Sequence, residues 1–144
     1  MTDPFTLSRF VKAQAPHYET ALAELAAGRK QSHWMWFIFP QLYGLGRSAM
    51  ADQYGISGLP EAQAYLAHPT LGPRLATSTQ LVLDSRAASL TDLFGTPDDM
   101  KFRSSMTLFA MAASSPDNLY QMALSRWCQD RPDRNTLILL GRKG

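Results

Sequence analysis

The sequence predicts an all-α protein, a compact single domain (residues 1–144) of about eight short helices around a buried central helix near residues 97–113. Apolar residues recur at helical spacing in most segments, and glycine or proline separates these segments. Sustained period-two alternation does not occur, although FIF at 37–39 and LILL at 137–140 would suit short buried strands. The length of 144 residues and the 45% hydrophobic content are those of one globular domain.

The first half of the chain carries helix start and stop signals in close succession. Asp3 and Pro4 suit the N-cap and the first position of a helix over residues 4–14. The next helix begins near Tyr18 and ends at Gly28, because glycine readily adopts the left-handed conformation that closes a helix. Further short helices are expected at residues 48–54, 59–69 and 70–84.

The second half contains the clearest helical signal. A one-turn helix is expected at residues 91–94, and the central helix follows with Thr96 as its N-cap and Pro97 as its first residue. Apolar side chains surround that helix, which predicts that it is buried. Two further helices are expected, one starting at Ser115 and a last one capped by Asp133.

Charge and composition exclude several classes of protein. A net charge of +2 with scattered basic residues provides no stripe for a nucleic acid. No apolar run reaches the roughly 18 residues of a membrane helix, and the N-terminal segment, with its acid at Asp3, does not resemble a secretory signal. The only cysteine, Cys128, suits a reducing compartment. We therefore expect a cytoplasmic protein. Its oligomeric state, monomer or small homo-oligomer, is left open by the sequence.

Metal ions and cofactors are not expected. The histidines His17, His33 and His68 are far apart and show no metal-ligand spacing. The turn GLGRS, residues 44–48, lacks the spacing of a phosphate-binding loop, and the dinucleotide glycine pattern is missing. This turn either links two helices or, alternatively, offers its amides to an anion.

The candidate site centres on KQSHWMWFIFPQL, residues 30–42, in which a lysine and a histidine precede a run of aromatic residues. On a helix most of this run is buried, but a rim of polar residues and Trp36 remains. If the fold brings cations to these tryptophan rings, the resulting site would suit a ligand that carries a phosphate on a ring able to stack on tryptophan. The expected ligand-binding residues are Lys30, His33, Trp34, Trp36, Gln41, Arg47, Lys101, Arg103 and Ser104.

Most of these residues also have a structural explanation. Lys30 suits the carbonyl end of the preceding helix, and Lys101 stands three residues after Asp98, which is ion-pair spacing. His33 suits an ordinary core or surface histidine, because no carboxylate partner for it can be identified from the sequence. The Ser104 hydroxyl would ordinarily bond to the carbonyl four residues earlier, and no nucleophile elbow surrounds it, so no catalytic residue is assigned.

Four stretches of the chain resemble a known family: DPFTLSRFVKAQ, ALAELAAGRKQSHWMWFIFPQLYGLGRSAMADQYGI, EAQAYLAHPTLGPRL and LFGTPDDMKFRSSMTLFA. They are similar to a bacterial family of unknown function whose members are often labelled "calpastatin", and the resemblance runs from Asp3 to about Gly141. It implies a multihelical fold and no established activity. The label implies inhibition of a calcium protease, but calpastatin is long and largely disordered, unlike this apolar-rich chain.

Three functions stand as hypotheses, and the sequence selects no reaction class and leaves enzymatic activity open. The first is binding of, or action on, a small anionic ligand that is phosphate- or nucleotide-like. The second is a non-enzymatic interaction module that exposes the aromatic run to a partner protein. The third is the calpain inhibition that the label names. Convergence of Lys30 and Lys101 in space would favour the first, and burial of Trp34 and Trp36 would count against the second.

Overall fold

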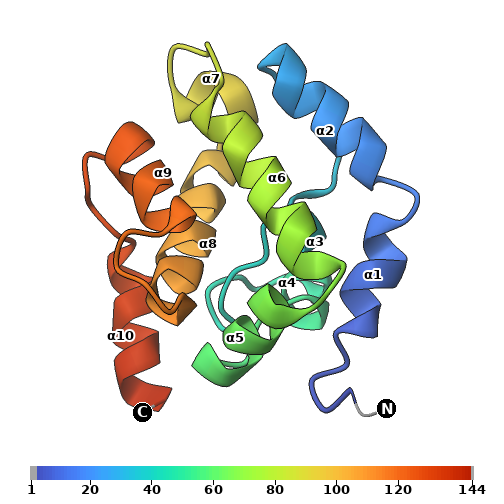
Figure 1. The fold of residues 1–144 in the computed structure, drawn as a ribbon, viewed down its shortest axis with the longest axis vertical. Helices are drawn as coiled ribbons and strands as arrows, with labels where there is room; N and C mark the ends of the chain where they lie inside the picture. The colour runs from blue at the N-terminus through green and yellow to red at the C-terminus, as the bar shows by residue number, and fades with distance from the viewer. Residues whose placement is uncertain (1–2, 144) are drawn as a thin grey trace.

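The structure, a computed structural model, describes residues 3–143, with side chains up to residue 141. These residues form ten helices and no strand, which confirms the all-α class (Figure 1). Leu42 and Ile56 form an isolated parallel bridge. The helices are α1 (Ser8–Gln14), α2 (Tyr18–Ala27), α3 (Met35–Ile38), α4 (Ala49–Gln53), α5 (Leu59–Ala67), α6 (Leu71–Leu83), α7 (Leu90–Phe94), α8 (Asp98–Ala112), α9 (Leu119–Trp127) and α10 (Arg134–Lys143).

The described residues contain more helices than the expected eight, partly because the aromatic run forms a short helix of its own. Phe37 and Ile38, in the first candidate strand, belong to α3. The other candidate strand lies within α10. That helix starts as expected, since the Asp133 carboxylate accepts a hydrogen bond from the Thr136 amide at 2.9 Å.

Helix α8 is the central helix, as expected. It contacts α5, α7, α9 and α10 (Figure 1). Phe102, Met106 and Phe109 are fully buried on it, and the hydroxyl residues between them are buried as well. With 15 residues it is the longest helix described, and no helix in residues 3–143 is long and apolar enough to cross a membrane.

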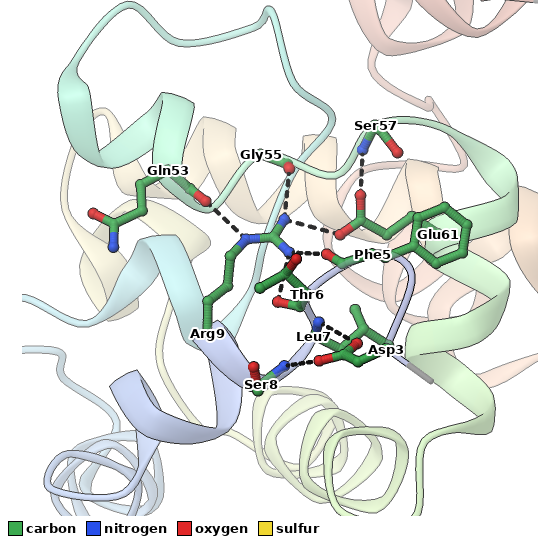
Figure 2. A network of polar contacts seen from close by, with 10 residues as sticks. All are labelled: Asp3, Phe5, Thr6, Leu7, Ser8, Arg9, Gln53, Gly55, Ser57 and Glu61. Carbon is green, nitrogen blue, oxygen red and sulfur yellow. Dashed lines mark hydrogen bonds and ion pairs between the residues drawn. The ribbon is translucent and has the colours of Figure 1, made fainter. Parts of the chain in front are cut away.

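Helix α1 begins at Ser8 rather than at Pro4. Thr6 adopts a φ of 54°, which is incompatible with a continuous right-handed helix. Asp3 still acts as a cap, because its carboxylate accepts the amides of Leu7 at 2.7 Å and Ser8 at 3.0 Å (Figure 2). These backbone hydrogen bonds lower the pKa of Asp3.

Two other helices also begin later than the sequence predicts. The N-cap of α8 is Pro97, one residue after the expected Thr96. The N-cap of α9 is Asn118, so this helix begins well after Ser115. The side-chain oxygen of Asn118 accepts a hydrogen bond from the amide three residues later at 2.9 Å. An asparagine in this position satisfies an amide that the helix itself leaves without a partner.

Arg9 joins α1 to the end of α4, to the segment that follows it and to α5 (Figure 2). Its guanidinium donates to the carbonyls of Gln53 at 2.8 Å and Gly55 at 3.0 Å, and it pairs with Glu61 at 2.8 Å. Glu61 is only 3% exposed and also accepts the Ser57 amide at 2.8 Å. Each oxygen of this buried carboxylate thus accepts a hydrogen bond, one of them from a cation, and this network fixes the start of α5 against α1.

Candidate ligand-binding site

Trp34 belongs to the hydrophobic core. Its ring is fully buried and packs against Phe39 and Phe94, with ring centroids 6.3 and 6.5 Å away. Its indole N–H donates to a carboxylate oxygen of Glu24 at 3.0 Å. Trp34 therefore offers no face on which a ligand could stack. Its contribution to the expected site is to support the Lys30 ammonium, which lies over its ring.

Glu24 fixes the turn that leads from α2 to α3. Its carboxylate accepts the amides of Gln31 and Ser32 at 2.8 and 2.9 Å, and the Ser32 hydroxyl at 2.6 Å. Partial burial acts to raise the pKa of Glu24, but the hydrogen bonds from Ser32, Gln31 and Trp34 outweigh it and lower the pKa to about 2. The charged form of Glu24 is therefore the one that orders this turn.

Glu24 makes the stability of the protein depend on pH in the acidic range. Between its usual pKa of 4.5 and the folded value of about 2, the unfolded chain binds more protons at Glu24, so its stabilising effect is lost as the pH falls through this range. We expect Glu24→Gln to lower the melting temperature at neutral pH and the deficit to shrink near pH 2. Glu19→Gln, an exposed change on the same helix, is the control. An equal Glu24→Gln deficit at both pH values would contradict this prediction.

Lys30, Asp98 and Lys101 form what we call the lysine cluster. Lys30 Nζ lies 2.9 Å from one oxygen of Asp98, and Lys101 Nζ lies 3.7 Å from the other. Each ammonium also lies over an indole ring, Lys30 at 5.1 Å from the centroid of Trp34 and Lys101 at 5.4 Å from that of Trp36. The fold thus brings together two of the expected cations and both expected tryptophans.

A small hollow lies beside Trp36 and Lys101, and Gln41 contributes to its wall. Its volume of about 10 Å³ leaves room for roughly one water molecule. Trp36 is partly exposed and lines this hollow. A ligand larger than water would therefore lie on the surface over Trp36 and not inside a deep pocket.

The remaining expected residues do not join this cluster by any contact. His33 and Arg47 are exposed, and neither takes part in an ion pair within the described part of the chain. Arg103 follows Lys101 by two positions, about 200° around α8, and it lines a different hollow. Ser104 donates to the carbonyl four residues earlier at 3.2 Å, which is the ordinary fate of a hydroxyl inside a helix.

Asp98 is the residue that sequence reasoning left out of the site. Its spacing from Lys101 indicated an ion pair, and the structure contains that contact. The closer contact with Lys30 joins positions that are far apart in the sequence, so no local pattern could have indicated it. The described residues hold no group of three or more His, Cys, Asp or Glu side chains that could bind a metal ion.

Fold and site together define a small all-α protein with a cationic and aromatic surface cluster. The chain belongs to the family described as "Protein of unknown function (DUF1810)", which matches residues 4–140. It is similar to the crystal structure of a conserved hypothetical protein from Mycobacterium tuberculosis, with 52% sequence identity and a TM-score of 0.93. The match covers 96% of this chain and 99% of the other. A search of curated proteins found no significant match.

These comparisons confirm the family and the multihelical fold that the sequence indicated. The family is described as one of unknown function and the mycobacterial protein as hypothetical, so neither brings an activity, a ligand or a partner to this chain.

Proposed function

We propose that the protein binds a small anionic ligand, with a phosphate-like group at Lys101 and a planar ring on Trp36. The observation that carries this proposal is that one carboxylate, Asp98, serves two lysines. One negative charge balances only one of the two ammonium groups. The lysine cluster therefore keeps a net positive charge beside a partly exposed aromatic ring.

The two lysines differ in how firmly Asp98 holds them. Lys30 is 7% exposed and lies at hydrogen-bond distance from the carboxylate, so the charges of Lys30 and Asp98 neutralise each other. Lys101 is 27% exposed and lies 3.7 Å away, beyond a good hydrogen bond. The donors of Lys101 are therefore available to a phosphate oxygen, whereas those of Lys30 are committed to the fold.

Trp36 supplies the second half of the proposed recognition. Its indole ring lies beneath the Lys101 ammonium, and Gln41 stands at the edge of the same hollow with an amide that can donate or accept hydrogen bonds. A nucleotide combines an anion with a stackable ring and matches this arrangement. No catalytic group is assigned, because no described nucleophile lies among these contacts.

The interaction-module hypothesis has less support. Met35, Phe37 and Ile38 are buried together with Trp34, so most of the aromatic run is unavailable to a partner protein. Trp36 alone in the run is partly exposed, which is a small anchor for a protein interface. The ordered helical domain also gives no support to calpain inhibition by a calpastatin-like disordered segment.

Lys101→Gln is expected to weaken the binding of adenosine monophosphate, used as a probe, by about tenfold or more, because a charge-assisted hydrogen bond is lost. Isothermal titration calorimetry measures the dissociation constant, and quenching of tryptophan fluorescence that disappears in Trp36→Ala reports contact with the Trp36 ring. Lys12→Gln, which removes an exposed lysine from α1, is the matched control. Equal affinities of Lys101→Gln and wild type, or no binding of nucleotides, inorganic phosphate or sugar phosphates to wild type, would refute the proposal.

The cytoplasmic location stays part of the proposal. It is supported by the single buried cysteine, which has no partner for an internal disulfide. Fractionation of cells that express the tagged protein would test it, with recovery outside the cytoplasm as the contradicting result.

A further inference from the structure

A larger hollow lies between the start of α7, the first turns of α8 and the loop from α9 to α10. We call it the Arg103 hollow. Its volume is about 350 Å³, which is in the range of pockets that hold small molecules. It shares no lining residue with the hollow beside Trp36. Its lining includes the apolar side chains of Leu90, Met100 and Trp127 and the charged side chains of Asp99, Arg103 and Arg131.

Arg103 is fixed in this hollow by one edge of its guanidinium. Its Nε donates to the backbone carbonyl of Arg131 at 2.7 Å. Among the described residues no carboxylate lies within ion-pair distance of Arg103. Both terminal nitrogens therefore keep their donors available, in the planar arrangement that matches a carboxylate or a phosphate.

The acidic residue of the hollow already has other partners. Asp99 accepts the Thr91 hydroxyl at 2.7 Å and the Met100 amide at 2.8 Å. It therefore does not compensate Arg103 directly. Because Arg131 adds a second cation, the charged side chains of the hollow carry one net positive charge.

The loop that supplies Arg131 has an unusual backbone conformation. Gln129 and Asp130, neither of them glycine, have φ angles of 57° and 59°. The Asp130 amide donates to the Leu124 carbonyl at 3.1 Å, and the Arg131 amide donates to the Cys128 carbonyl at 2.9 Å. Conformations of this kind persist where surrounding contacts hold them, and they are frequent at ligand clamps. The loop thus holds the carbonyl that orients Arg103 in place before any ligand binds.

We propose that the Arg103 hollow binds a second small organic anion, a carboxylate or phosphate on an aromatic or apolar body. Arg103 and Arg131 hold the oxyanion, and Trp127 with Leu90 and Met100 packs against the body. One face of Trp127 is already covered by the Arg126 guanidinium, 4.2 Å from the ring centroid, so the ligand contacts the part of the ring that lines the hollow. This site is independent of the function proposed for the lysine cluster.

Cys128 provides a probe of occupancy, because it is the only cysteine of the chain and it lines the hollow while 8% exposed. Burial raises the pKa of its thiol, so its alkylation by iodoacetamide is slow. We expect phenyl phosphate and benzoate to slow that alkylation further, because the bound ring covers the thiol. Inorganic phosphate and acetate test the oxyanion without the apolar body, and we expect them to protect less.

Arg131→Gln is the most informative variant, because Arg103 is held by the backbone carbonyl of residue 131 and not by its side chain. We expect it to raise the dissociation constant for phenyl phosphate about tenfold in calorimetry, and Arg103→Met to abolish binding. Arg86→Gln removes an exposed arginine outside the hollow and serves as the control. Lys101→Gln should leave this affinity unchanged, which separates the two sites. The proposal is overturned if wild type binds neither aromatic anion, or if both hollow variants bind like wild type.

Discussion

Replacing Arg9 with methionine is expected to lower the free energy of unfolding by about 3–5 kcal/mol, because it leaves a buried carboxylate without its cation. Glu61 is 3% exposed and would keep only the Ser57 amide of its partners in the network (Figure 2). The carbonyls of Gln53 and Gly55 would lose their donor as well. Urea denaturation followed by circular dichroism measures the change.

The double variant Arg9→Met with Glu61→Gln is the control for this interpretation. Glutamine removes the buried charge while it keeps an oxygen for the Ser57 amide. We expect the double variant to be more stable than Arg9→Met alone, since the largest penalty is that of the unpaired charge. If the double variant were the less stable of the two, the stability lost in Arg9→Met would come from the unpaired carbonyls of Gln53 and Gly55. It would not come from the buried charge of Glu61.

Trp34→Ala is expected to lower the free energy of unfolding by about 3–5 kcal/mol, as large-to-small changes at fully buried aromatic positions do. The change opens a cavity between Phe39 and Phe94 and removes the indole donor to Glu24. Chemical denaturation at neutral pH measures the loss of stability.

Trp36→Ala is the matched comparison, since Trp36 lies two residues away and is only partly buried. We expect a clearly smaller loss of stability from Trp36→Ala, together with the larger loss of affinity for the nucleotide probe. If Trp34→Ala cost no more stability than Trp36→Ala, the assignment of Trp34 to the core and of Trp36 to the site would be wrong.

Much of the fold could be predicted because its signals are local. Gly28 ends α2 with a φ of 80°, and the Ser48 hydroxyl caps α4 by accepting the Ala51 amide at 3.1 Å. Each of these depends on side chains within a few residues. The start of α1 was predicted less well, because the left-handed turn at Thr6 has no strong sequence signal. The Arg9 guanidinium donates to the Thr6 carbonyl at 3.0 Å, and the same guanidinium is held by the distant carbonyls of Gln53 and Gly55.

The candidate site could be predicted only in part. The aromatic run and the surrounding cations are visible in the sequence, but their pairing depends on how α2, α3 and α8 meet. Lys101 and Arg103 illustrate the limit, since a separation of two residues places them on different sides of one helix. The same geometry that brings Lys101 to Lys30 directs Arg103 into another hollow.

By itself, the sequence determined the helical class, the identity of the central helix and the family, because periodicity, caps and motifs are encoded in neighbouring residues. Tertiary structure decided which aromatic residues are core and which are accessible, that Asp98 holds two lysines, and that Arg103 lies apart with no carboxylate partner among the described residues. The physical reason is that burial and ion pairing depend on distances between segments far apart in the chain. Those distances are fixed only when the helices pack.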